Sequence, residues 1–175
     1  MRNIVLRFGL IAGLILSAML LLNLGLIEQI GFDYGALIGY TTMVLAFLMI
    51  YFGIRSYRDQ IANGVVGFGR ALLIGLLITG ISSACYVATW QVVYHQFAPD
   101  FIDKYTAYEI QKAEQGGADP QQLATMRQEF AEFAEMYENP LFNIAVTFLE
   151  PLPPGVLISL ISALVLSRRR APATA

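Results

Sequence analysis

Four long apolar runs constrain this chain more than any other feature of its sequence. Residues 8–27, 34–54 and 71–94 are 20, 21 and 24 residues long and carry no charged side chain. About 20 helical residues suffice to cross a hydrocarbon core of ~30 Å. The fourth run, residues 141–167, carries one charge and three prolines. We therefore expect an all-α integral membrane protein, a single domain over residues 1–175, with a bundle of four transmembrane helices at about 4–27, 34–54, 69–94 and 141–167.

The first run has a second interpretation, a cleavable signal peptide, since Arg2 and Arg7 precede it. Its apolar stretch is longer than the usual ~7–15 residues of such a peptide, and no small-residue cleavage pattern follows it. We therefore predict that this segment is a retained membrane helix.

Cationic residues gather on one side of the predicted spans. Eight of the eleven lie there: Arg2, Arg7, Arg55, Arg58, Arg70, Arg168, Arg169 and Arg170. The other side carries Lys104, Lys112 and Arg127 together with twelve of the thirteen acids. Since cationic loops remain in the cytoplasm, we predict a multi-pass protein of a cytoplasmic membrane whose N- and C-termini are cytoplasmic and whose loop 95–140 is extracytoplasmic.

Residues 98–139 predict an extracytoplasmic helical hairpin between the third and fourth transmembrane helices. Asp100 is placed to cap its first helix, and Gly116 with Gly117 would end that helix. Asp119 and Gln122 have the spacing of a capping box at the start of the second helix. The pattern is typical of two helices joined by a tight turn.

An apolar stripe at helical spacing follows the second hairpin helix: Leu123, Met126, Phe130, Phe133 and Tyr137. The stripe has three interpretations: packing on the first hairpin helix, contact with the membrane surface, or a partner-binding surface formed by Phe130, Phe133 and Tyr137. Helices that lie on membranes usually carry Lys or Arg on the polar face, whereas this polar face is acidic. Packing on protein is therefore the favoured interpretation.

Glu150 is the sharpest candidate for function within the spans. It precedes Pro151, Pro153, Pro154 and Gly155, which break an otherwise apolar segment. A carboxylate at membrane depth is a functional candidate by default, and the alternative is that Glu150 faces water and caps the final helix.

Four further polar residues would lie near the same end of the bundle as Glu150. They are Asn23, Gln91, His95 and Asn143, and with Glu150 they form our candidate polar site. Trp90 and Tyr94, in the same region, are expected to anchor the helix at the membrane interface.

Small residues recur at four-residue spacing in every span. The runs are Gly9, Gly13 and Ser17; Gly35 and Gly39; Ala71, Gly75, Thr79 and Ser83; and Ser159, Ala163 and Ser167. Such faces let membrane helices approach closely. We expect them to serve packing within the chain, with homo-oligomerisation as the alternative.

Several stretches resemble the DUF4199 family, a bacterial membrane domain of unknown function. They are Gly67-Phe68-Gly69-Arg70 with Gly75, Pro99-Asp100-Phe101 with Lys104-Tyr105, Asn139-Pro140, and Thr147 to Gly155 followed by Leu160-Ile161-Ser162-Ala163. The resemblance implies four spans, a hairpin between the third and fourth, and a location in the bacterial cytoplasmic (inner) membrane. It implies no activity and no catalytic residue.

Composition narrows the class of function. Only 14% of residues are charged and 57% are hydrophobic, against about 25% charged in soluble domains, which argues against a nucleic-acid-binding protein and most soluble enzymes. One His and one Cys exclude a zinc site of those residues alone. No nucleophile with a base is visible, so we expect no catalytic residue, metal or cofactor.

Three interpretations of function remain for the chain, of which an intramembrane enzyme is the least favoured. The favoured one is a non-enzymatic structural or accessory protein that lies in the lipid bilayer and meets a membrane-protein partner or another copy through the hairpin or a small-residue face. The alternative is a small transporter or lipid-handling protein that uses Glu150.

Overall fold

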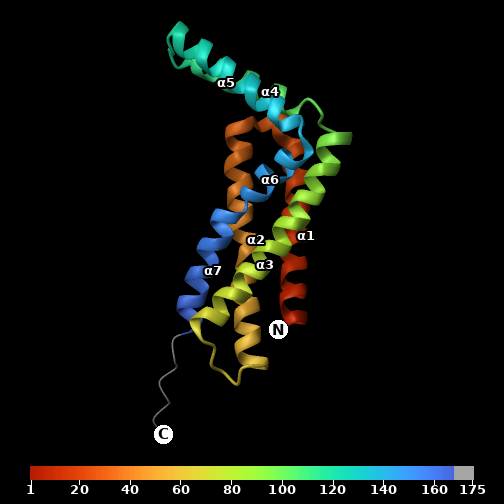
Figure 1. Ribbon diagram of the computed structural model, residues 1–175, viewed down its shortest axis with the longest axis vertical. Coiled ribbons are helices and arrows are strands. Elements are labelled where there is room, and N and C mark those ends of the chain that lie inside the picture. Colours follow the sequence, from red (N-terminus) through yellow and green to blue (C-terminus); the bar gives the residue numbers. More distant parts are fainter. Residues whose placement is uncertain (168–175) are drawn as a thin grey trace.

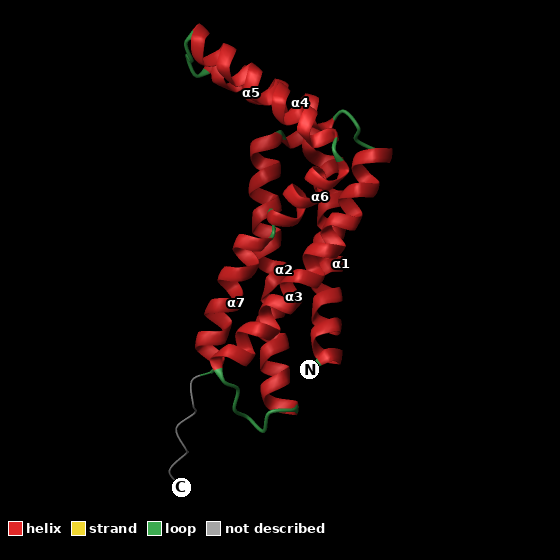
Figure 2. Ribbon diagram, in the orientation of Figure 1, coloured by secondary structure: helices red, strands yellow, loops and turns green. Residues whose placement is uncertain are grey.

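The computed structural model describes residues 1–167, and every element of that part of the chain is a helix (Figures 1 and 2). The helices are α1 (Arg2–Ile30), α2 (Phe32–Gln60), α3 (Phe68–Gln96), α4 (Phe101–Gln115), α5 (Pro120–Glu138), α6 (Pro140–Leu149) and α7 (Leu152–Leu166). The all-α class is thereby confirmed. Arg168, Arg169 and Arg170, on which part of the orientation prediction rests, lie outside the described residues.

Four elements are long and apolar enough to cross a membrane, so this is a membrane protein. They are Arg2–Ile27, Phe32–Gln60, Phe68–Gln96 and Pro140–Leu166, the last of which comprises α6 and α7. Figure 1 shows Met1 and the end of α7 at one end of the bundle, here called the terminal end, and α4 and α5 at the other, here called the hairpin end. The spans therefore run between two ends of different composition.

Local signals in the sequence set several helix boundaries. Asp119 accepts from the backbone N–H groups of Gln121 and Gln122, and the Gln122 side chain accepts from the Asp119 N–H, which completes the predicted capping box. Gly117 has φ +82°, a backbone conformation that suits glycine at the turn between α4 and α5. The prediction that Asp100 caps α4 is wrong, because its carboxylate instead pairs with Lys104 at 3.1 Å.

Small residues bring α3 against its two long neighbours. On the α1 side, a Cβ added at Gly13 would lie 2.7 Å from the Cys85 Cβ. On the α7 side, a Cβ added at Gly75 would lie 2.7 Å from the Ser159 hydroxyl oxygen. These small faces are therefore occupied by contacts within the chain, as close helix packing in membranes requires.

The terminal half of the bundle has a closed apolar core. Its fully buried side chains are Phe47, Ile50, Ile54, Ile74 and Ile78, each with no accessible surface. Interiors packed in this way leave few voids larger than a water molecule. The core therefore closes the bundle on the side of the chain termini.

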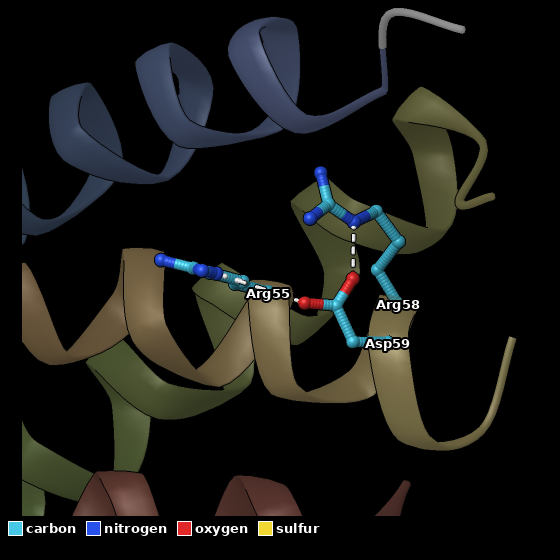
Figure 3. A network of polar contacts seen from close by, with 3 residues as sticks. All are labelled: Arg55, Arg58 and Asp59. Carbon is cyan, nitrogen blue, oxygen red and sulfur yellow. Dashed lines mark hydrogen bonds and ion pairs between the residues drawn. The ribbon is translucent and has the colours of Figure 1, made fainter. Parts of the chain in front are cut away.

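Cationic side chains mark the terminal end. Asp59 accepts from Arg58 Nε at 2.7 Å and lies 3.6 Å from Arg55 Nε, as Figure 3 shows. Arg70, at the start of α3, donates to the Tyr57 hydroxyl at 3.3 Å. Arginine side chains of this kind place their charge beyond the apolar core while their stems cover it.

The hairpin of α4 and α5 is held to the bundle through aromatic rings. Phe32, at the start of α2, lies 5.8, 5.6 and 5.1 Å from the ring centroids of Phe101, Tyr105 and Tyr108. Beside these rings, Lys112 Nζ donates to Asp33 Oδ1 of α2 at 2.6 Å. This hydrogen bond raises the pKa of Lys112. In Figure 1 the far end of the hairpin extends past α2, away from the bundle.

Candidate functional site

A cavity of 390 Å³ lies at the hairpin end, between α1, α2 and α3. The hairpin covers it, and the start of the α6–α7 break closes one side. Its walls include Leu16, Met19, Leu20, Asn23, Leu24, Ala36, Gly39, Thr42, Met43, Tyr86, Trp90, Tyr105, Phe133, Tyr137 and Glu150. The volume falls within the about 300–1,000 Å³ typical of small-molecule sites, which are likewise mostly apolar with a few polar groups.

Small residues on α2 leave the space that the cavity occupies. Gly35, Ala36 and Gly39 face this region, where longer side chains would fill the gap between α1 and α2. Asn23 of α1 crosses to α2 here, and its Nδ2 donates to the Gly35 carbonyl at 2.7 Å. The predicted small-residue face of Gly35 and Gly39 is therefore partly open to the cavity and not fully packed against a helix.

Glu150 borders the cavity from the break between α6 and α7. Its Oε2 accepts a hydrogen bond from the Tyr86 hydroxyl at 3.0 Å. Glu150 is exposed, and it lines a cavity that is open to the outside. α7 begins without a side-chain cap, so Glu150 does not serve as the cap of the final helix.

The prolines after Glu150 enrich this region in hydrogen-bond acceptors. A proline has no N–H, so Pro151, Pro153 and Pro154 remove the helical donors of the carbonyls four residues earlier. Those carbonyls belong to Thr147, Leu149 and Glu150 itself. Regular hydrogen bonding resumes where the Gly155 N–H reaches the Pro151 carbonyl at 3.1 Å. Backbone breaks at membrane depth persist where protein or a water-filled space surrounds them.

A chain of hydrogen bonds forms a second polar feature beside the cavity. Gln91 Nε2 donates to Asn143 Oδ1 at 2.7 Å, and the Thr147 hydroxyl donates to the same oxygen at 3.5 Å. The Thr147 and Tyr137 hydroxyls are 3.4 Å apart, and Trp90 Nε1 donates to the Tyr137 oxygen at 2.9 Å. The chain joins α3, α5 and α6, and burial raises the pKa of Tyr137.

The structure separates the predicted polar site into two groups and one outlier. Glu150 and Asn23 line the cavity, whereas Gln91 and Asn143 belong to the hydrogen-bond chain. His95 is exposed, with its ring 5.3 Å from that of Tyr94, and does not line the cavity. The candidate ligand-binding residues are therefore Glu150 and Asn23.

Two of the three residues predicted as a partner surface, Phe133 and Tyr137, face the cavity. Tyr137 is 6% exposed and bonded to Trp90, so its side chain is not available on an outer surface. Phe133 is half-buried, packs on Tyr137 and Phe142 at 5.5 and 6.1 Å, and lines the cavity. Phe130 is half-buried. Two of the three thus help to cover the cavity.

Tyr86 and Trp90 are site residues that the sequence analysis did not identify. Trp90 was expected at the membrane interface, but it is 8% exposed and lines the cavity. A signal existed for Tyr86, since it lies inside an apolar span and a buried tyrosine hydroxyl usually has a hydrogen-bond partner. Its partner is 64 residues away in the sequence, which no local pattern reveals.

Comparison with known protein families matches residues 7–168 to a family described as "Protein of unknown function (DUF4199)". The match covers nearly the whole chain. No curated protein and no solved structure matches it.

Proposed function

Because the chain belongs to the DUF4199 family, whose description assigns no activity, we propose a function from its own cavity. The protein is a lipid-handling membrane protein that binds an amphipathic molecule, with the apolar part in the cavity and the polar head near Glu150. The cavity of 390 Å³ with a single carboxylate on its wall carries this proposal.

The wall chemistry suits a flexible apolar chain. Leucines from α1 and aromatic rings from α3, α4 and α5 line the cavity. Met19 and Met43 add unbranched side chains, which adapt to ligands of different shape. An amphiphile would bury its chain here at a gain of about 25 cal/mol per Å² of apolar surface removed from water.

The path to the cavity favours uptake from the hairpin end. A neighbouring hollow of 420 Å³ shares Leu24, Ile27, Phe32 and Phe101 with the cavity and extends to Asp100 and Lys104. Below the cavity, Leu16 and Met43 are 2% and 3% exposed and join the closed core. A cavity that continues toward the hairpin end and is closed toward the terminal end supports a protein that binds an amphiphile from one leaflet. It does not support a channel through the membrane.

Trp90 provides a direct test because it is the one tryptophan of the chain and lines the cavity. Alkyl amphiphiles with a brominated chain should quench its fluorescence in a saturable manner when added to the purified protein in micelles. Free lipid should quench it weakly, since Trp90 is 8% exposed. Non-saturable quenching, or none, would contradict binding in the cavity.

A cavity-filling variant is the matched control. A Cβ at Gly39 would lie 3.5 Å from Asn23 Nδ2, an ordinary contact, and Gly39 lines the cavity, so the side chain of Gly39→Leu is expected to occupy the cavity. This variant should lose the saturable quenching and keep its fold by circular dichroism. Equal quenching in both proteins would place the ligand elsewhere.

The hairpin favours a second candidate function, binding of a protein partner. Its far end extends beyond the bundle in Figure 1, and Glu129, Glu132 and Glu135 are exposed on α5. A photocrosslinker at position 132 should capture a defined partner or a second copy in native membranes if the hairpin is an interface. Random crosslinking to many proteins would count against it.

We further propose that the hairpin is extracytoplasmic and that both chain ends are cytoplasmic, in a bacterial inner membrane. Arg55, Arg58 and Arg70 at the terminal end support this orientation, since cationic loops are retained on the cytoplasmic side. The amphiphile would then come from the outer leaflet of that membrane.

A further inference from the structure

We infer that the ligand is a cationic amphiphile whose ammonium group binds the Glu150 carboxylate. The inference rests on the proposed function and adds the chemical class of the head group. Three observations on the cavity and its surroundings carry it: the charge of the wall, the hydrogen-bonding capacity of the wall, and the charge of the hairpin end.

The first observation is that the cavity wall has a negative group without a positive one. Glu150 lines the cavity, and none of the described wall residues is Lys, Arg or His. Its Oε2 is bonded to the neutral Tyr86 hydroxyl, and for Oε1 the described part of the chain offers no partner. Glu150 is exposed to the open cavity, and a ligand ammonium would form a charge-assisted hydrogen bond with its carboxylate.

The second observation is that most hydrogen-bond donors of the wall are engaged, whereas the Glu150 carboxylate can accept more. Asn23 Oδ1 also has no hydrogen-bond partner in the described structure, but it is buried beside Gly35 and does not face the cavity. The donors of Asn23, Tyr86 and Trp90 are bonded to the Gly35 carbonyl, Glu150 and Tyr137.

An ammonium group has three donors and no acceptor, which matches a wall whose accessible charged acceptor is the Glu150 carboxylate. The Tyr105 hydroxyl, in the cover, is also on the wall and can accept a hydrogen bond as well as donate one. The hydrogen-bonding capacity of the cavity thus fits a head group that donates.

The third observation is that the hairpin end attracts cations. Residues 95–140 carry nine acids and three cations, and each of these cations is paired with an acid. Lys104 pairs with Asp100, Lys112 with Asp33, and Arg127 with Glu114, at 3.1, 2.6 and 2.6 Å. The remaining acids produce a negative field, which raises the local concentration of cations and speeds their association.

The same arrangement disfavours anionic and zwitterionic heads. A fatty-acid carboxylate or a lipid phosphate placed near Glu150 would meet a like charge with no cation on the described wall to offset it. The ligand class is therefore an amphiphile whose ammonium is its one charged group, and a zwitterionic phospholipid serves as a comparison.

The test uses four brominated amphiphiles of one chain length, with an amine, an alcohol, a carboxylic acid or a phosphoethanolamine head. Their affinities are measured by quenching of Trp90 in the full-length protein in neutral micelles. The amine should bind about tenfold or more tightly than the alcohol, because a charge-assisted hydrogen bond exceeds a neutral one by that much. The carboxylic acid and the phosphoethanolamine should bind more weakly than the amine.

Two variants connect this preference with Glu150. Glu150→Gln should abolish the preference for the amine and retain binding of the alcohol, which also reports that the cavity is intact. Glu129→Gln removes a charge from the exposed face of α5 and should leave the preference in place.

The outcomes separate the two proposals. Equal affinities of amine and alcohol in the unmodified protein would overturn the head-group inference and leave the lipid-handling function standing. An undiminished amine preference in Glu150→Gln would also overturn it. Failure of all four amphiphiles to bind would overturn the proposed function itself.

Discussion

At the scale of single residues, the pair of Glu150 and Tyr86 is the feature that most distinguishes this bundle from a simple apolar one. The hydroxyl of Tyr86 on α3 donates to Glu150 at the α6–α7 break, at 3.0 Å. The bond holds the carboxylate at the cavity wall and joins the two segments across it.

Tyr86→Phe removes the donor and keeps the ring. We expect the free energy of unfolding in mixed micelles to fall by about 1 kcal/mol, less than the about 1.5–3 kcal/mol of hydrogen bonds to charged groups, because Glu150 is exposed. Glu150→Gln should cost less, since an amide oxygen still accepts from Tyr86. Unchanged stability of Tyr86→Phe would mean that the bond contributes nothing.

The sequence identified one member of this pair for a physical reason. A lone charge in an apolar run is visible without any structure, and so Glu150 could be predicted as a candidate. The partner could not, because the contact depends on which face of α3 meets the α6–α7 break. Asn23 was likewise identified by polarity, but its bond to the Gly35 carbonyl follows from the crossing of α1 and α2.

At the scale of helices, the contact between α3 and α7 is set by residues without bulk. A Cβ at Gly155 would overlap the Thr79 side chain, and Thr79 is itself 1% exposed and bonded to the Gly75 carbonyl at 3.0 Å. The two helices cannot move apart without opening the closed core. Position 155 therefore requires a residue without a side chain.

Gly155→Ala tests that requirement. Overpacking of this kind costs about 1–3 kcal/mol, which exceeds the about 0.5–1 kcal/mol that alanine gains over glycine in a helix, so we expect a net loss of thermal stability in detergent. Gly80→Ala is the control on α3, where nothing lies within 4 Å of an added Cβ. It should be neutral or stabilising, and an equal loss in both variants would contradict the packing argument.

Helix boundaries were predictable where a signal is local, and less so where two local signals compete. The capping box of Asp119 and Gln122 depends on residues three apart, so spacing alone predicted it. Asp100 also has the position of a cap, but Lys104 one turn later takes its carboxylate. The capping pattern predicts the position of a cap, but it does not consider that the same carboxylate can pair with a cation four residues later.

At the scale of the whole molecule, the two halves of the bundle differ in how well they are filled. Side chains such as Phe47 and Ile78 close the terminal half, whereas the hairpin half holds the cavity under α4 and α5. The four spans follow from apolar length and could be predicted from sequence. The cavity could not, because it depends on where Gly35 and Gly39 face across the bundle.

Orientation in the membrane is a property of the whole chain, and cysteine labelling tests it. Cys85 is the one native cysteine, so a Cys85→Ala background can carry single cysteines at the exposed positions Gln115 and Val65. An impermeant maleimide should label Gln115→Cys in intact spheroplasts. It should label Val65→Cys only after the spheroplasts are lysed. The reverse pattern would overturn the predicted orientation.

The lipid-handling function is tested most directly by what the protein retains when it is purified gently from native membranes. Mass spectrometry of the protein under non-denaturing conditions should show one amphiphile bound at near one copy per chain, and Gly39→Leu, with its cavity filled, should lose it. Retention of the same molecule at the same level by both proteins, or of bulk membrane lipid alone, would contradict a ligand in the cavity.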